Sequence, residues 1–193
     1  MNRQELFLLS DAALRDVINM IGPDQLSLAA PAEWSRRANP TLRDILAYHA
    51  FDEAWVPDVL AGRTAEEVGS RYDGDLLGED PVAGYNEIND AAAQAVAYDL
   101  DYDQVVHLSY GDFSLGEYLE HTSTYRAFQA WSIAHFLGLN YSLPDPLVDG
   151  LWEIIGPQID GFRAMGVFPP EVQVPEDSTK ETLLLAKVGY WRP

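Results

Sequence analysis

Apolar residues recur every three or four positions in several stretches of the chain, and this is the spacing of one face of an α-helix. The first stretch covers residues 4–21 and is followed by a Gly-Pro pair, which typically ends a helix. The second covers residues 40–61 and begins at Asn39-Pro40, a polar cap with proline at the first helical position. Both stretches are predicted to be helices.

Similar start signals predict two further core helices. A polar residue followed by proline opens residues 81–98, which are rich in alanine. Ser114 and Glu117 have the spacing of a capping box, in which each side chain hydrogen-bonds the other residue's amide. This box predicts a helix over residues 114–137.

The C-terminal part is predicted to be a helical extension over residues 145–189. Its first helix follows an Asp-Pro pair and carries a clear apolar stripe, and Pro157 is expected to kink it by removing one hydrogen bond. A second capping box, from Ser178 to Glu181, predicts a last short helix that ends near Val188.

Two connecting segments are predicted not to be helical. Glycines make residues 64–79 mostly loop, whereas β-branched and aromatic residues predict an extended arm or a short hairpin over residues 104–113. At most one hairpin among five or six helices predicts an all-α protein, with an antiparallel helical bundle as the expected architecture. The length predicts a single domain over residues 1–193.

Charge restricts the expected partners. The chain has 31 acidic and 12 basic residues, and residues 66–120 contain fourteen acids but only one base, Arg71. A nucleic-acid backbone or an anionic membrane surface would meet a repulsive potential there. Neither is an expected partner.

The composition also bears on location. No stretch approaches the roughly 20 apolar residues that span a bilayer, and the N-terminus lacks the pattern of a signal peptide. We therefore expect a soluble, cytoplasmic protein. The chain has no cysteine, which excludes disulfide bonds, a thiolate nucleophile and cysteine-bound zinc.

Two of the four histidines have potential partners at helical spacing. His49 and Glu53 are four residues apart, as are His121 and Tyr125, and Gln129 lies one turn further on. Imidazole and carboxylate groups that project from facing helices can bind a metal ion. The alternative is that each histidine is partly buried and makes an ordinary hydrogen bond.

Other chemical motifs are missing or incomplete. His107 and His135 have no acid or imidazole at helical spacing, so both are interpreted as structural. Asp73 begins a stretch that resembles a calcium loop, but Gly84 stands where that loop needs a bidentate glutamate. No phosphate-binding glycine loop and no His-Glu-x-x-His motif occurs.

A family resemblance rests on several short segments taken in order. These segments are residues 41–46, 55–57, 60–63, 73–81, 107–113, 117–119, 166–168 and 170–172. In order and spacing they resemble the metal-binding domain of mycothiol-dependent maleylpyruvate isomerase-like proteins, in the DinB/YfiT superfamily. The resemblance implies an up-down-down-up four-helix bundle with extra C-terminal helices, and a homodimer as in many members.

The resemblance also implies where a metal would bind. The family holds zinc or nickel through the histidine of an R-D-x-x-x-H run and two residues in a D-x-x-x-H-x-W-D context. Trp131 aligns the second motif, so the three ligand positions here are Tyr48, Tyr125 and Gln129, with Ser132 in place of the final acid. Phenol and amide oxygens are far weaker ligands than imidazole and carboxylate. We therefore expect a degenerate, metal-free site, and no cofactor.

A displaced metal site is the alternative ligand arrangement. It would consist of His49, Glu53 and His121, but a shift of one residue turns a helical side chain by about 100°, usually out of the same pocket.

The altered site allows two classes of function. In one, the protein is a metal-independent isomerase or cyclase, with Tyr48 or Tyr125 as general acid, Gln129 polarising a carbonyl, and His49 or His121 as base. In the other, it is a non-catalytic protein that binds a small organic molecule. The remaining residues of the predicted pocket are Trp55, Phe128, Trp131, Asp52, Glu53 and Ser132.

Two further readings stay open. Family membership by itself would imply a metal-dependent mycothiol (thiol) transferase or maleylpyruvate isomerase-like enzyme that uses zinc or nickel. Alternatively, the tyrosines only fill the space that a metal once occupied.

Overall fold

The computed structural model describes residues 1–192, which divide into two compact units. Unit 1 combines Met1–Val17 with the chain from Leu119 onward, and unit 2 is Ile18–Tyr118. Helices dominate both units, and within residues 1–192 the only sheet is one two-stranded hairpin. The predicted all-α class is therefore confirmed, whereas the single domain over residues 1–193 stays a prediction.

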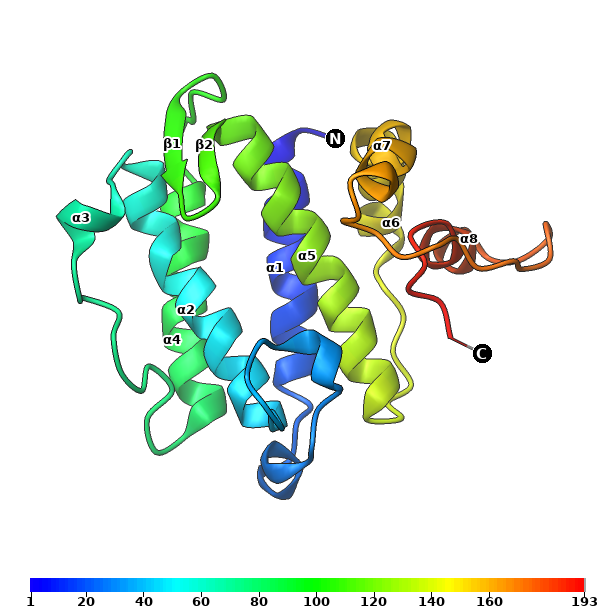
Figure 1. Ribbon diagram of the computed structural model, residues 1–193, viewed down its shortest axis with the longest axis horizontal. Helices are drawn as coiled ribbons and strands as arrows, with labels where there is room; N and C mark the ends of the chain where they lie inside the picture. Colours follow the sequence, from blue (N-terminus) through cyan, green and yellow to red (C-terminus); the bar gives the residue numbers. More distant parts are fainter. Residues whose placement is uncertain (193) are drawn as a thin grey trace. The chain divides into compact units, whose positions relative to one another are not determined.

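Unit 2 is built around a pair of packed helices. Its elements are η1 (Pro23–Ser27), η2 (Ala32–Trp34), α2 (Leu42–Leu60), α3 (Ala65–Val68), α4 (Pro81–Val96), β1 (Val105–Leu108) and β2 (Gly111–Ser114). Helices α2 and α4 lie side by side (Figure 1), and their facing sides bury apolar residues such as Ile45, Val56 and Ala92. This packing leaves the opposite side of α2 available to form a site.

Helix α2 begins two residues later than the sequence predicts. Thr41 is its cap: the Thr41 Oγ1 atom accepts a hydrogen bond from the Asp44 amide at 3.3 Å, and the Asp44 carboxylate accepts one from the Thr41 amide at 2.9 Å. Asn39 instead has a left-handed backbone, with φ of 51°. The prediction of Asn39 as cap was wrong because the reciprocal Thr41–Asp44 box satisfies two amides at once.

The segment that was predicted to be mostly loop contains one short helix, α3. Thr64 and Glu67 form a second reciprocal box, with the Thr64 amide donating to the Glu67 carboxylate at 2.8 Å. The rest of residues 64–79 is turns and irregular chain, as expected. Asp80 then caps α4 by accepting a hydrogen bond from the Ala83 amide at 3.1 Å, which confirms that predicted start.

The predicted hairpin is also present. Strands β1 and β2 are antiparallel, with Val105 opposite Ser114 and Leu108 opposite Gly111. The predicted capping box follows directly, because the Ser114 amide donates to the Glu117 carboxylate at 2.9 Å. The hairpin therefore leads straight into the next helix.

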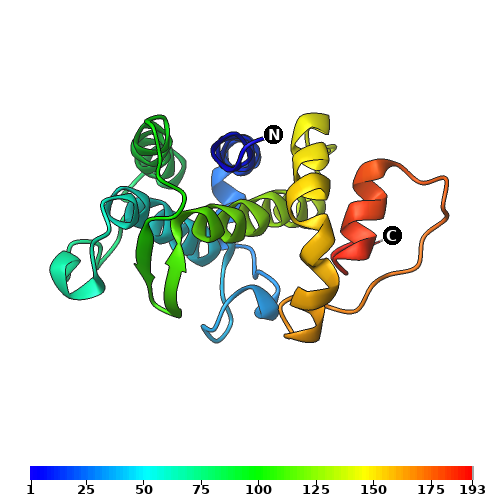
Figure 2. The ribbon, with the colours of Figure 1, turned by 90° about the horizontal axis from the view of Figure 1, so that it is seen from above.

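Unit 1 contains the remaining helices. They are α1 (Arg3–Ile18), α5 (Leu115–Phe136, which enters this unit at Leu119), α6 (Asp145–Ile154), η3 (Gly156–Gln158), α7 (Ile159–Ala164) and α8 (Lys180–Lys187). Figure 2 shows α8 beside α6. Among the helices of residues 1–192, none has both the length and the apolar character needed to cross a membrane.

A buried ion pair connects α1 with α5. The Arg126 Nη1 atom lies 3.2 Å from the Asp11 Oδ1 atom, and both side chains are almost inaccessible to solvent. The Arg126 guanidinium also lies over the Phe7 ring, 4.4 Å from its centroid. The pair therefore sits inside the apolar core of unit 1.

The C-terminal extension departs from the prediction at two points. Gly156-Pro157 ends α6 and starts the short helix η3, rather than kinking one continuous helix. Helix α8 is capped by Thr179, which accepts a hydrogen bond from the Thr182 amide, so the predicted box from Ser178 to Glu181 was wrong. The physical reason is that Glu181 accepts a hydrogen bond from the Leu143 amide at 2.7 Å instead.

Candidate functional site

The residues that the sequence predicted for a site fall into two groups. The first group lies on α2 in unit 2 and consists of Tyr48, His49, Asp52, Glu53 and Trp55. The second lies on α5 in unit 1 and consists of His121, Tyr125, Phe128, Gln129, Trp131 and Ser132. That the two groups line one pocket stays a prediction.

Helix α2 separates its own group into two environments. Tyr48 is 55% exposed, whereas His49 and Glu53 are buried. The Tyr85 hydroxyl of α4 donates a hydrogen bond to the Glu53 Oε1 atom at 3.2 Å. Glu53 thus belongs to the interior of the α2–α4 pair, while Tyr48 faces outward.

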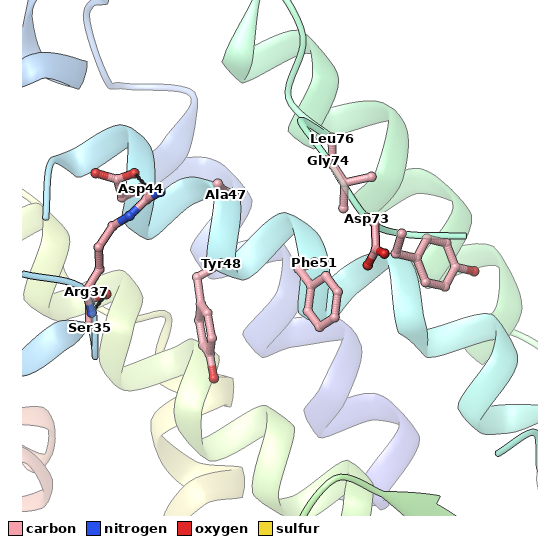
Figure 3. A pocket seen from close by; sticks show the side chains of 10 residues that line it. Ser35, Arg37, Asp44, Ala47, Tyr48, Phe51, Asp73, Gly74 and Leu76 are labelled. Carbon is pink, nitrogen blue, oxygen red and sulfur yellow. Dashed lines mark hydrogen bonds and ion pairs between the residues drawn. The ribbon is translucent and has the colours of Figure 1, made fainter. Parts of the chain in front are cut away.

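A cleft of about 360 Å³ opens on the outward side of α2 (Figure 3). Of the predicted site residues, only Tyr48 lines it. Its full lining is Ser35, Arg37, Asp44, Ala47, Tyr48, Phe51, Tyr72, Asp73, Gly74 and Leu76. The volume lies within the range of roughly 300–1,000 Å³ that small-molecule sites occupy.

One wall of the cleft is a single face of α2. Asp44, Tyr48 and Phe51 are spaced four and three residues apart, which places them one above another on a helix. Figure 3 shows Tyr48 and Phe51 projecting from the same side of the helix. The side chains of Tyr48 and Phe51 are 55% and 38% exposed, so two neighbouring aromatic rings are accessible to a ligand.

The opposite wall is the irregular segment that follows α3, and one side chain of α2 holds its first end. The buried Asp58 carboxylate accepts hydrogen bonds from the Tyr72 hydroxyl and from Arg71, both at 2.7 Å. Arg63 lies 3.3 Å from the same carboxylate. Tyr72 also meets Trp55 edge to face, with ring centroids 5.5 Å apart. These contacts fix the Tyr72 ring at the cleft.

A second anchor holds the other end of this wall. The Arg43 Nη2 atom donates to both Asp75 carboxylate oxygens, at 3.0 and 2.8 Å, and to the Gly78 carbonyl oxygen at 3.2 Å. These bonds from Arg43 hold the pKa of Asp75 below its usual value. The segment between Tyr72 and Asp75 is therefore tied to α2 at both ends.

The two ends of the cleft differ in charge. At one end Arg37 pairs with Asp44, whose pKa is lowered chiefly by the hydrogen bond from the Thr41 amide (Figure 3). At the other end, the Asp73 carboxylate has no hydrogen-bond or ion-pair partner within residues 1–192. Figure 3 shows the rings of Tyr48 and Phe51 between these ends.

Charge around Tyr48 further favours its neutral phenol, which is already the form of an ordinary tyrosine at neutral pH. The Asp52 carboxylate, followed by burial, raises the pKa of Tyr48 above its usual value of 10.0. Burial, followed by the charge of Asp52, likewise raises the pKa of Tyr110, which lies at the turn of the hairpin. Tyr48 is therefore a hydrogen-bond donor at neutral pH rather than a phenolate.

Sequence reasoning missed most of this cleft. Phe51 could have been found, because it lies one helical turn from Tyr48. Tyr72 had no such spacing, and Asp73 stood out only in the incomplete calcium-loop pattern, since both come from a glycine-rich segment whose position depends on the anchors at Asp58 and Arg43.

On α5, Gln129 is a polar side chain at a buried position. It is 4% exposed, and its Oε1 atom has no hydrogen-bond partner within the described chain. Its neighbours in sequence have partners inside unit 1: Phe128 packs on Tyr190 with centroids 5.2 Å apart, and Trp131 stacks on His135 at 4.8 Å. The Ser132 hydroxyl donates to the Phe128 carbonyl oxygen at 2.7 Å.

The residues at the implied metal positions do not fit a divalent metal. Tyr48, Tyr125 and Gln129 offer two phenols and an amide, which are weak donors to zinc or nickel. Across residues 1–192, no group of three His, Asp or Glu side chains has an arrangement that could hold a metal ion.

Comparison with known proteins gives no family. No family model matches the chain, and no curated protein or solved structure matches it. Function is therefore inferred from the geometry of the cleft.

Proposed function

We propose that this protein binds a small organic molecule in the α2 cleft and does so without a metal ion. The observation that carries the proposal is the cleft itself, in which Tyr48 and Phe51 present exposed aromatic rings beside fixed polar groups. Covering an aromatic ring removes apolar surface from water, at about 25 cal/mol per Å². A flat ligand between α2 and the facing wall would gain that contribution from both rings.

The construction of the cleft favours binding. The anchors at Asp58 and Arg43 hold the facing wall before any ligand arrives, so less conformational entropy is lost on binding. The neutral Tyr48 phenol can donate a hydrogen bond to a carbonyl or hydroxyl oxygen. The same proton would allow Tyr48 to act as the general acid of a metal-independent isomerase or cyclase.

The implied family architecture belongs to the same proposal. A DinB-like four-helix bundle would take its core from residues 4–21, 40–61, 81–98 and 114–137, helices that the two units share. The resemblance would make Tyr48 of unit 2, and Tyr125 and Gln129 of unit 1, the counterparts of the family's metal ligands. The absence of a partner for the Gln129 Oε1 atom supports a polar ligand group at that position.

Ligand-observed NMR on the full chain, treated with a chelator, tests the proposal. A set of aromatic fragments with positive, neutral and negative charge is screened against the native protein and three variants. We expect binding that Tyr48→Ala and Phe51→Ala each weaken by about tenfold, because each removes aromatic contact area. Tyr98→Ala is the matched control, since Tyr98 is 74% exposed but does not line the cleft.

Two results would contradict the proposal. One is that the Tyr48→Ala and Phe51→Ala variants bind the fragments as tightly as the Tyr98→Ala control does. The other is binding that appears only when zinc or nickel is added back.

A further inference from the structure

Building on the proposed function, we infer that the ligand of the α2 cleft is an organic cation, an ammonium group carried on a flat apolar body. The inference starts from the charges in the lining. The lining contains one base, Arg37, and two acids, Asp44 and Asp73, which leaves one net negative charge. Arg37 and Asp44 already neutralise each other, so the uncompensated charge is that of Asp73.

Asp73 lies between the two anchors of its wall, and its side chain is exposed. Its neighbours in the chain carry the anchors, because Tyr72 is bound to Asp58 and Asp75 is bound to Arg43. Asp73 itself makes no side-chain hydrogen bond or ion pair within the described residues. The fold therefore holds the backbone of Asp73 at the cleft and leaves its carboxylate for another partner.

The rings beside Asp73 suit the same kind of ligand. Tyr48, Phe51 and Tyr72 all line the cleft, and the face of an aromatic ring attracts a cation within about 6 Å of its centroid. A carboxylate together with several aromatic faces is the combination that binds alkylammonium groups. A simple carboxylate ligand, by contrast, would be repelled by Asp73.

Most charges around the cleft also favour a cationic ligand, with one exception. The Asp52 carboxylate is the main cause of the raised pKa of Tyr48, and after burial it also raises the pKa of Tyr110, so Asp52 contributes negative charge on that side of α2. The wall that carries Asp73 also belongs to the acid-rich stretch of residues 66–120. Such a field concentrates cations near the protein.

The exception fixes the orientation of the ligand. Arg36 acts on Tyr48 with the opposite sign, and Arg37 lies at the Asp44 end of the cleft. The ammonium group therefore belongs at the Asp73 end. Neutral or electron-rich atoms of the ligand belong at the Arg37 end.

Isothermal titration calorimetry with three probes of matched size tests the inference. The probes are phenethylammonium, 2-phenylethanol and 3-phenylpropionate, which differ mainly in charge. We expect phenethylammonium to bind at least tenfold more tightly than 2-phenylethanol and 3-phenylpropionate to bind most weakly. Benzyltrimethylammonium should also bind, because a cation beside aromatic rings needs no N–H donor.

A pair of variants separates the local effect of Asp73 from the overall charge. Asp73→Asn should weaken phenethylammonium binding by about tenfold and change 2-phenylethanol binding by less than twofold. Glu66→Gln removes the same charge from an exposed residue outside the cleft, and it should change neither affinity by more than about twofold. Both sites are exposed, so neither variant should disturb folding.

The outcomes distinguish this inference from the proposed function. If 2-phenylethanol or 3-phenylpropionate binds as tightly as phenethylammonium, or if Asp73→Asn and Glu66→Gln act alike, the cation assignment is overturned while the binding function stands. If none of the probes binds and the fragment screen is also negative, the proposed function fails and the inference fails with it.

Discussion

Tyr48 and His49 are adjacent in sequence yet lie in opposite environments. One helical step turns the side chain by about 100°, so Tyr48 reaches the cleft while His49 is buried. The sequence identified both as candidates, because both are chemically suited to a site. Only the packing of α2 against α4 shows which of them can meet a ligand from solvent.

The first prediction at this scale concerns the acidity of Tyr48. The Asp52 charge is the main cause of its raised pKa, so Asp52→Asn should move that pKa down toward 10.0. At neutral pH the phenol stays protonated in both proteins. NMR titration of the Tyr48 ring, with Asp73→Asn as the comparison, measures the change. An unchanged Tyr48 pKa in Asp52→Asn would show that the two groups do not interact.

A second prediction concerns the ion pair in unit 1. Asp11→Ala removes the carboxylate that pairs with the buried Arg126 guanidinium, and should lower the free energy of unfolding by about 3–5 kcal/mol. Asp149→Ala, which removes an exposed pair with Lys180, should cost less than about 1 kcal/mol. Urea denaturation measures both. Equal effects would mean that burial does not control the contribution of the Asp11 pair.

At the scale of elements, helix starts show what local pattern can decide. Asp80 and Ser114 cap the helices that the sequence assigned to them. At α2 and α8 the chain offers two neighbouring cap candidates, and the other one is used. Glu181 cannot complete a box with Ser178 because it binds the Leu143 amide, a contact between segments that are far apart in sequence.

Substitution tests the corrected start of α2. Thr41→Ala removes the capping oxygen and should lower the free energy of unfolding by about 1 kcal/mol. Asn39→Gly should change it by only a few tenths of a kcal/mol, because glycine accepts the left-handed backbone found there. Thermal denaturation of both variants compares them. A larger loss of stability in Asn39→Gly than in Thr41→Ala would show that Asn39 is the more important cap.

The contact between α4 and the cleft wall gives another prediction. A Cβ atom at Gly84 would lie 2.2 Å from the Leu77 carbonyl oxygen, so Gly84→Ala must displace the segment that carries Asp73. We expect lower stability together with weaker ligand binding. At Gly161 of α7 an added Cβ meets no atom within 4 Å, and Gly161→Ala should stabilise by up to about 1 kcal/mol. Unchanged ligand binding in Gly84→Ala would show that the contact between α4 and Leu77 does not support the cleft.

For the molecule as a whole, the sequence was most informative where interactions are local. Helical periodicity, proline and the box at Ser114 located the main helices and the hairpin, because the atoms that form them are close in the chain. The cleft joins α2 to residues 72–76, and the contacts of Asp58 and Arg43 place that segment. Composition and residue spacing do not predict contacts between such distant residues, so Asp73 was not predicted as a site residue.

Binding in the α2 cleft is tested by a protein-observed NMR titration of the full chain with phenethylammonium in the presence of a chelator. We expect amide shifts to change most strongly at residues 35–37, 44–51 and 72–76, and we expect Asp73→Asn to reduce these changes. Shifts that centre on other residues, or that need an added metal ion, would contradict metal-free binding in the α2 cleft.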